Sequence, residues 1–205
     1  MNLMALVSRC ARKGIPVDIA HGTDFSATLI DSARQDSRRL LRADLSERVF
    51  FDVARNESLS RELAAATRRD PEAVAGSFDF VFGVNTFRYC NRLGNADECA
   101  NEIYRLLRPG GTCVMIDMNG RFPAFRSHLF GPAKPSEELH MPSLQEYAQP
   151  FERAGFEMLR KEHFCWVPHS AGPMLTAVCR ALTPVLNATI RSRAMRSLVV
   201  VRKPA

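Results

Sequence analysis

The stretch EIYRLLRPGGTCVMIDM, residues 102 to 118, contains the end of a helix, a turn and a strand in immediate succession. A helix is expected over residues 96–107, because its apolar side chains recur at helical spacing. Residues 108–111, Arg-Pro-Gly-Gly, are predicted to end that helix. The run TCVMIDM at 112–118 is largely apolar, which is typical of a buried strand. The stretch therefore predicts the helix-to-strand connection of an α/β protein.

Strands and helices alternate on both sides of this stretch. The run FDFVFGV at 78–84 is the clearest strand, and its apolar character is typical of a parallel sheet that is covered on both faces. Ser143 and Glu146 form a capping box, which predicts that a helix begins there. The alternation predicts an α/β fold, namely a Rossmann-like, doubly wound and mostly parallel sheet with helices on both faces.

The remaining elements are predicted from apolar spacing and from turn residues. Gly14 is expected to end the first helix, Ser26 is a good N-cap, and Pro184 is expected to interrupt the apolar helix at 174–190. Residues 68–76 are predicted to form a surface loop. The other predicted strands lie at 17–23, 49–53, 156–164 and 198–201, and the other helices lie at 3–13, after Ser26, around 59–66 and over 144–154.

The composition is that of an ordinary globular protein. The chain has 205 residues, of which 46% are hydrophobic and 24% are charged, and this excludes a disordered or collagen-like chain. The net charge is +6, but the arginines are spread from Arg9 to Arg202 among acidic residues. A nucleic-acid-binding protein would concentrate this charge on one face, so no nucleic-acid partner is expected.

The cysteines and the N-terminus both indicate a cytoplasmic protein. The six cysteines include no CxxC pair, so neither a zinc ribbon nor a redox motif is present, and no metal site is expected. Most lie in apolar runs, as buried thiols do in a reducing compartment. Residues 1–11 carry no basic residue before their apolar stretch, and no apolar run is long enough to cross a bilayer.

Polar residues follow the predicted strands, where ligands bind in a doubly wound sheet. An acid at the end of such a strand can accept hydrogen bonds from both ribose hydroxyls, and an aromatic residue after it can cover an adenine face. Both are present after the strand at 17–23, which favours a nucleoside cofactor. The residues that follow the strands are Asp24-Phe25-Ser26, Asn56-Glu57, Gly83-Val84-Asn85-Thr86 and Asp117-Met118-Asn119.

An ordered set of segments over almost the whole chain resembles the class I S-adenosylmethionine-dependent methyltransferases. The set as a whole is specific, although LRPGG alone could end many helices. The matching segments are GTDFSATLIDSAR at 22–34, SFDFVFGVNTFRY at 77–89, EIYRLLRPGGTCVMIDM at 102–118, AGF at 154–156 and LVVVRKP at 198–204.

The resemblance implies S-adenosylmethionine as the cofactor and assigns its binding residues. Asp24 would hold the ribose hydroxyls and Phe25 would line the adenine, with Ser26 beside them. This family places an acid near the adenine amine. The most similar position in this chain is Arg55, so Asn56 or Glu57 is expected to make that contact instead. The remaining implied contacts, to the methionine and ribose portion, are those of Gly83, Val84 and Asn85.

The N-terminus departs from the family pattern. A first strand and a glycine-rich loop should precede the second strand's acid, here Asp24, by about twenty residues, because the loop glycines let the backbone approach the cofactor. Counting back from Asp24 places that loop at or before Met1. We therefore expect the first βα unit to be incomplete and the natural protein to have the strand and loop encoded upstream, with Met1 or Met4 mistaken for its start.

Several of these residues also have a purely structural interpretation. Asp24 could be a turn or helix-capping acid, although its place in GTDFS after a strand favours the ligand role. Asn85 is as well explained by a turn as by a cofactor contact, and Asp117 and Asn119 are expected to be turn-forming residues. The apolar helix at 174–190 could cover a pocket for an apolar acceptor, but packing on the sheet is the favoured interpretation.

Methyl transfer makes small demands on acid–base groups, because the sulfonium is already an activated donor, so alignment and exclusion of water matter most. No catalytic residue is assigned, and His169 and Tyr89 are the candidates for activating a hydroxyl acceptor. His169 and three other histidines lie where this family builds its substrate pocket, but a lone histidine is more often a surface or packed residue than a base. The other histidines there are His128, His140 and His163.

These observations predict one methyltransferase-like domain over residues 1–205, with a substrate-side insertion and cap at 120–190. The expected activity is transfer of a methyl group from S-adenosylmethionine to a small molecule, for which a hydrophobic acceptor is a candidate. One alternative is a non-catalytic fragment or pseudoenzyme that lacks the cofactor loop. Another, an NAD-type oxidoreductase, is disfavoured because the chain has no GxGxxG. The oligomeric state stays open.

Overall fold

The computed structural model describes residues 2–123, 141–168 and 171–205. They form two compact units, Met1–Val74 and Ala75–Ala205, and each unit is described by itself. Among the described helices, none is both long and apolar enough to cross a membrane.

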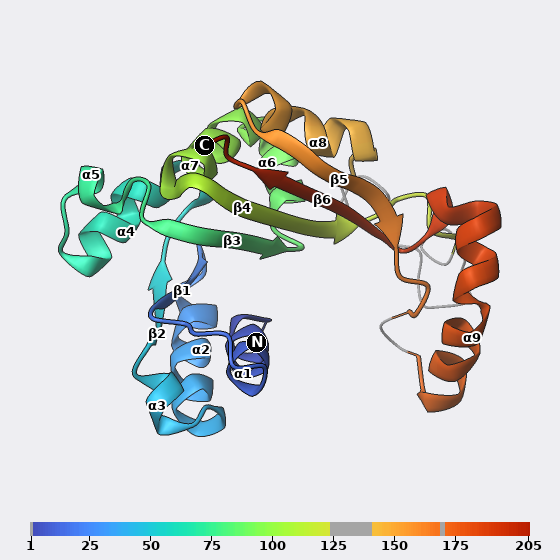
Figure 1. The fold of residues 1–205 in the computed structure, drawn as a ribbon, viewed down its shortest axis with the longest axis horizontal. Helices are drawn as coiled ribbons and strands as arrows, with labels where there is room; N and C mark the ends of the chain where they lie inside the picture. Colours follow the sequence, from blue (N-terminus) through green and yellow to red (C-terminus); the bar gives the residue numbers. More distant parts are fainter. Residues whose placement is uncertain (1, 124–140, 169–170) are drawn as a thin grey trace. The chain divides into compact units, whose positions relative to one another are not determined.

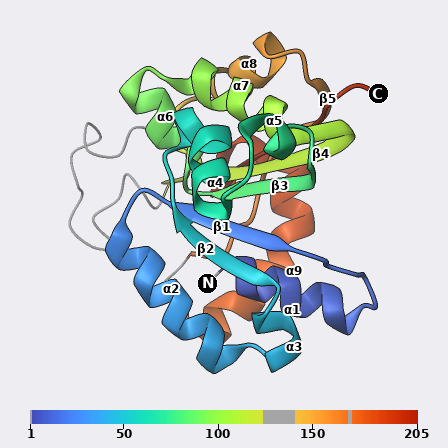
Figure 2. The ribbon, with the colours of Figure 1, turned by 90° about the vertical axis from the view of Figure 1, so that its left-hand side faces the viewer.

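The first unit is built on a parallel pair of strands (Figure 2). β1 (Ala20–Asp24) and β2 (Val49–Val53) run side by side, and the register places the carboxyl-terminal residues of both strands opposite each other. Their parallel course requires the crossover that the intervening helices supply. The helical segments are α1 (Asn2–Arg12), α2 (Ala27–Leu40), α3 (Ala43–Ser46), the 3-10 turn η1 (Asn56–Ser58), α4 (Leu59–Thr67) and α5 (Pro71–Val74).

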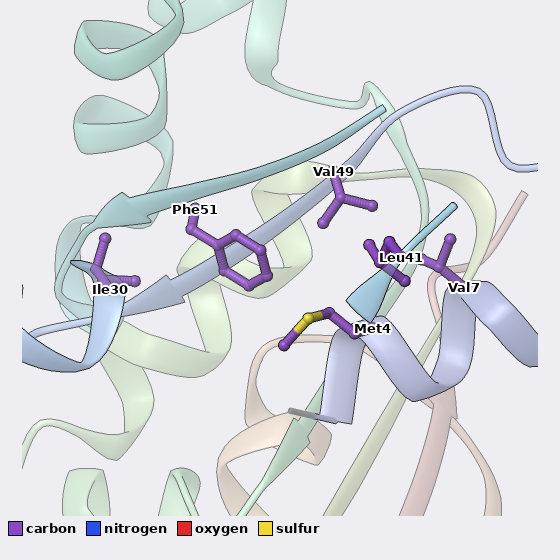
Figure 3. Close-up of a cluster of buried hydrophobic side chains, with 6 residues drawn as sticks. All are labelled: Met4, Val7, Ile30, Leu41, Val49 and Phe51. Carbon is purple, nitrogen blue, oxygen red and sulfur yellow. The ribbon is translucent and has the colours of Figure 1, made fainter. Parts of the chain in front are cut away.

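One cluster of buried side chains joins α1 and α2 to the two strands (Figure 3). Gly22 in β1 lies against the ring of Phe51 in β2, and a Cβ at position 22 would be only 2.7 Å from two ring carbons. A larger residue at position 22 would therefore displace the aromatic core of this unit. The cluster consists of Met4, Val7, Ile30, Leu41, Val49 and Phe51.

The second unit is a four-stranded mixed sheet in the order β3-β4-β6-β5 (Figure 1). β3 and β4 are parallel, whereas β6 lies antiparallel between β4 and β5. The strands are β3 (Phe78–Val84), β4 (Leu107–Met118), β5 (Glu157–Phe164) and β6 (Arg196–Arg202). The helices are α6 (Phe87–Leu93), α7 (Ala96–Leu106), α8 (Leu144–Arg153) and α9 (Pro173–Ile190), followed by the 3-10 turn η4 (Arg191–Arg193).

Aromatic side chains from α6 and α8 form the core of the second unit. Phe87 and Phe151 lie with ring centroids 4.5 Å apart, and Tyr147 meets Phe87 edge-on at 5.7 Å. All three are fully buried. Ser143 and Glu146 form the expected capping box at the start of α8. The capped helix thus holds its aromatic face against α6.

Most elements lie where the sequence predicted them, including the helix ended near Gly14 and the N-cap at Ser26. The predicted loop at 68–76 is wrong, because it contains the short helix α5 with Val74 buried. The helix expected over 96–107 ends at Leu106, close to its predicted stop, but residues 108–111 belong to β4 and do not form a separate turn. Hydrogen bonds of 2.9 Å from the Gly110 amide to the Lys203 carbonyl, and from the Lys203 amide to the Gly111 carbonyl, attach this segment to the C-terminal strand.

Two further expectations on burial are corrected. β3 was expected to be covered on both faces, but it is an edge strand of the described sheet and Phe80 is 44% exposed. Helix α9 was expected to be interrupted at Pro184 and packed on the sheet. Instead it continues through Pro184, and none of its residues is buried. Apolar sequence alone does not distinguish a buried element from an exposed apolar one.

Candidate functional site

The turn from β1 into α2 presents an acid and an aromatic ring next to each other. Asp24 ends β1, and its Oδ1 accepts a hydrogen bond of 2.9 Å from the Ser26 amide. Ser26 caps α2 by accepting one of 3.4 Å from the Leu29 amide. The second oxygen of Asp24, Oδ2, accepts no hydrogen bond from the described residues, and Phe25 is 73% exposed. Asp24 is thus a turn residue that keeps one carboxylate oxygen available.

The turn after β2 lies at the same edge of the strand pair. The Ala54 amide donates to the Asp24 carbonyl at 3.0 Å, which continues the ladder past the ends of both strands. Asn56 and Glu57 follow in η1. Glu62 holds this turn, because its carboxylate accepts from the Arg55 amide at 2.8 Å and from the Ser58 hydroxyl at 2.6 Å. The first unit therefore gathers five of the predicted cofactor residues at one carboxyl edge.

In the second unit, the predicted residues Gly83 and Val84 end β3, and Asn85 follows it. Gly83 pairs with Met115 of β4, and a Cβ there would be 2.6 Å from the Met115 sulfur. A larger residue at this position would therefore have to displace the Met115 side chain. Asn85 adopts a left-handed backbone with φ of 58°, which asparagine tolerates better than most residues. Its amide donates to the Ile116 carbonyl at 2.9 Å, and its Oδ1 accepts from the Arg196 guanidinium.

Asp117, at the end of β4, is the centre of a buried polar network. Its Oδ2 accepts from the Arg88 amide at 3.0 Å and lies 3.4 Å from the Tyr147 hydroxyl, while its Oδ1 accepts from the Met118 amide at 3.1 Å. Arg88 Nε lies 3.5 Å from Oδ1. Burial raises the pKa of Asp117 despite these donors and the nearby arginines. Burial and Asp117 together also raise the pKa of Tyr147.

Two buried guanidinium groups interact with this carboxylate, Arg88 by direct contact and Arg196 through its charge. Arg196, at the start of β6, is only 7% exposed, and burial is the main cause that lowers its pKa, with Arg88 lowering it further. Arg88 donates from Nη2 to the Tyr89 hydroxyl at 2.8 Å, and its guanidinium carbon lies 4.6 Å from the centre of that ring. Tyr89 is 42% exposed. The candidate hydroxyl of Tyr89 is therefore oriented by a buried cation.

The other candidate residues lie in different surroundings. His163 ends β5 with its Nδ1 3.3 Å from the Ser197 hydroxyl. Asn119 is a turn residue, as expected, because its Oδ1 accepts from the Arg121 amide at 3.0 Å, and its side-chain amide also donates to the Ser192 and Ala194 carbonyls at 2.9 and 2.7 Å. His169 lies outside the described residues, as do His128 and His140.

Sequence reasoning missed Arg88, Tyr147 and Arg196, and it assigned Asp117 only to a turn. A signal was present, because Asp117 is the one acid in an otherwise apolar strand, and a buried carboxylate requires partners. The partners could not be named from the sequence, since they come from three other elements. In the described residues, no group of three or more histidines, cysteines or carboxylates is placed to hold a metal ion.

A family model described as a methyltransferase domain matches residues 6–164, which is more than half of the chain. The chain belongs to the methyltransferase domain family. No curated protein sequence matches it. The matched range begins in α1 and ends in β5, so it includes the predicted cofactor residues of both units, whereas Arg196 lies beyond it.

Solved structures with this fold include methyltransferases that use S-adenosylmethionine. An S-adenosylmethionine-dependent methyltransferase from Methanosarcina mazei is 14% identical with a TM-score of 0.60, covering 98% of this chain and 85% of its own. The phosphoethanolamine N-methyltransferase 2 of Haemonchus contortus, solved with S-adenosylmethionine, is 15% identical with a TM-score of 0.56, covering 97% and 46%. At these identities the similarity shows the fold alone.

The fold also occurs with another activity. The [4+2]-cyclase SpnF is 17% identical with a TM-score of 0.60, and the match covers 100% of this chain and 80% of that one. Function must therefore be argued from the residues of the site. The chain is a methyltransferase by its family, and its site offers one available carboxylate oxygen, on Asp24, next to the exposed ring of Phe25.

Proposed function

We propose that this chain transfers a methyl group from S-adenosylmethionine to a small molecule, with a hydrophobic acceptor as the candidate. The observation that carries the proposal is the turn after β1, where Asp24 keeps Oδ2 available next to the exposed ring of Phe25. The family match extends across both compact units, which supports treating residues 1–205 as one methyltransferase domain.

Each predicted cofactor residue has a defined part in this proposal. Asp24 accepts hydrogen bonds from the ribose hydroxyls, Phe25 covers one face of the adenine, and Ser26 fixes the turn that orients both. Asn56 or Glu57 contacts the adenine amine from the adjacent turn. The segment Gly83 to Asn85 follows the methionine and ribose portion. The cofactor, when bound, supplies an activated methyl group on a sulfonium.

The acceptor side is built on the second unit. We propose that residues 120–190 form the substrate-side insertion and cap, and that Tyr89 orients a hydroxyl acceptor through the phenol that Arg88 holds. His169 is the second candidate for that part. The proposed compartment is the cytoplasm, which is supported by six cysteines of which none forms a disulfide. A metabolite screen with labelled S-adenosylmethionine would identify the acceptor.

Calorimetry with S-adenosylmethionine tests the cofactor assignment. Asp24→Asn removes the charged acceptor and should weaken binding at least about tenfold, since hydrogen bonds to charged groups contribute about 1.5–3 kcal/mol. Asp31→Asn is the matched control, because Asp31 is an exposed acid on α2 whose ion pair among the described residues is with Arg34. Equal binding by the wild type and Asp24→Asn would contradict the assignment.

The same titration separates an enzyme from a non-catalytic relative. It should be repeated on a version of the chain that is extended upstream through the expected glycine loop. Binding that is restricted to the extended form, or tighter in it, would support the proposed enzyme and assign the loop its part in cofactor binding. Binding by neither form would overturn the proposed function in favour of the non-catalytic alternative.

A further inference from the structure

The first unit has a hollow at the amino-terminal ends of its two strands. This hollow has a volume of about 240 Å³, and it is lined by the second half of α1, residues 14–17, Leu45 of α3 and Arg48. Residues 14–17 precede β1 and Arg48 precedes β2, whereas the proposed cofactor turn follows β1 at Asp24. The length of the strands therefore separates the hollow from the cofactor turn.

The walls of the hollow are apolar and rest on the core of the unit. Val7, which Figure 3 shows in the buried cluster, is only 2% exposed, and Val17 and Leu45 pack against that cluster. Ile15 also lines the hollow and is 52% exposed. An apolar group that displaces water from such walls is stabilised by the area that it buries.

Hydrogen bonds fix residues 14–17 on both sides. On the side of α1, Gly14 adopts the left-handed region with φ of 69°, and its amide donates to the Ala11 carbonyl at 3.1 Å. On the side of the strands, Arg48 Nη1 donates to the Val17 carbonyl at 3.3 Å. The hollow is thus formed by the fold itself, so a ligand would not have to order the chain in order to bind.

Among the described residues, Arg48 is the only charged one that lines the hollow. Its guanidinium forms no ion pair with any of them and makes the single hydrogen bond to Val17, which leaves N–H groups for a ligand. The carbonyl end of α1 would repel an anion, but Arg9 and Arg12 in its last turn offset that partial charge. The hollow therefore combines apolar walls with one cation.

This combination fits a small aliphatic carboxylate. An alkyl chain would cover the apolar walls, and a carboxylate can accept two parallel hydrogen bonds from one guanidinium. A neutral aliphatic molecule would fit the walls equally well but would make no use of Arg48. Nucleotides and other drug-sized ligands are too large, because the pockets that hold them measure about 300–1,000 Å³.

We propose that this hollow binds a short aliphatic carboxylate, with the alkyl chain against Val7, Val17 and Leu45 and the carboxylate on Arg48. The site goes beyond the proposed methyl transfer, because none of the predicted cofactor residues lines it. A ligand bound there would contact α1, residues 14–17 and α3 together, so it would stabilise the folded first unit.

Amide NMR of the full chain, titrated with hexanoate, tests this proposal and needs no cofactor, so its outcome is separate from that of the proposed activity. Hexanoate should shift the amide signals of Ala11, Gly14 and Val17. The alcohol 1-hexanol should shift the same signals but bind at least about tenfold more weakly, because it lacks the charge that Arg48 recognises. Arg48→Gln should reduce the affinity for hexanoate to about that for 1-hexanol. Arg12→Gln, a matched change at an exposed arginine that does not line the hollow, should bind hexanoate like the wild type.

A variant that fills the hollow completes the test. Ala11→Leu extends a lining side chain into the space and should abolish the binding of both hexanoate and 1-hexanol. Circular dichroism confirms that every variant is folded. The proposal is overturned if hexanoate shifts none of the lining amides, if 1-hexanol binds as tightly as hexanoate, or if either Arg48→Gln or Ala11→Leu binds hexanoate as well as the wild type.

Discussion

His163 combines burial with a nearby positive charge. Its ring is half-buried at the end of β5, and burial first and Arg121 second lower its pKa from the ordinary value of 6.5. The unfolded chain therefore binds a proton at this residue more readily than the folded chain does. As the pH falls below 6.5, unfolding takes up that proton and the free energy of unfolding decreases. The stabilisation from this residue is complete above that pH.

The pH dependence of unfolding tests this account. His163→Asn should flatten the decrease in the free energy of unfolding below pH 6.5, measured by urea titration at a series of pH values. Ser197→Ala is the control, because it removes the 3.3 Å contact with Nδ1 but keeps the imidazole, so its pH dependence should resemble that of the wild type. An unchanged slope in His163→Asn would refute the assignment.

Single residues were predictable where local chemistry decides their part. Ser26 caps α2 and Asn119 forms a turn as expected, because each side chain accepts a hydrogen bond from a backbone amide two or three residues further along the chain. Asp117 was not predictable in the same way. Its partners Arg88 and Tyr147 lie about thirty residues away on different helices, and such pairings depend on packing that the sequence pattern does not contain.

At the scale of elements, the close contact between β3 and β4 predicts how substitutions in the two strands affect stability. Gly83→Ala should lower the free energy of unfolding by about 1–3 kcal/mol, because its Cβ would lie 2.6 Å from the Met115 sulfur. Met115→Ala alone leaves a cavity and should cost about 2–5 kcal/mol. The double variant should be more stable than the sum of the two effects predicts, measured by urea unfolding. Strict additivity would mean that the two positions do not compete for the same space.

Elements were predictable in type more reliably than in environment. The apolar runs of β3 and α9 predicted a strand and a helix correctly, yet both were expected to be covered and both are exposed. Hydrophobic spacing reports which side of an element avoids water, but it does not report what covers that side. The start of β4 was missed for a related reason, because residues 108–111 become strand only through pairing with Lys203, far along the chain.

At the scale of the whole molecule, strand pairing predicts which strands are most protected from local unfolding. β4 and β6 each pair on both edges, whereas β3 and β5 are edge strands of the described sheet. β1 and β2 form a pair with no third strand among the described residues, and two-stranded sheets are only marginally stable in isolation. Protection from amide exchange should therefore decrease from the β4–β6 centre to the edge strands and be lowest in β1 and β2.

Hydrogen exchange followed by mass spectrometry measures this order directly, and it connects stability with function. Addition of S-adenosylmethionine should slow exchange most in the turn from β1 into α2, because Asp24 and Phe25 contact the cofactor in the proposed function. Peptides from α9 should not respond to the cofactor, since none of the predicted cofactor residues lies on that helix. Slow exchange of β1 and β2 without cofactor, equal to that of β4 and β6, would show that the first unit is stabilised by more than its two-stranded pairing. The carboxyl edge of β1 and β2, where the cofactor is proposed to bind, would then be ordered before the cofactor binds. Cofactor binding could not be the main cause of that order.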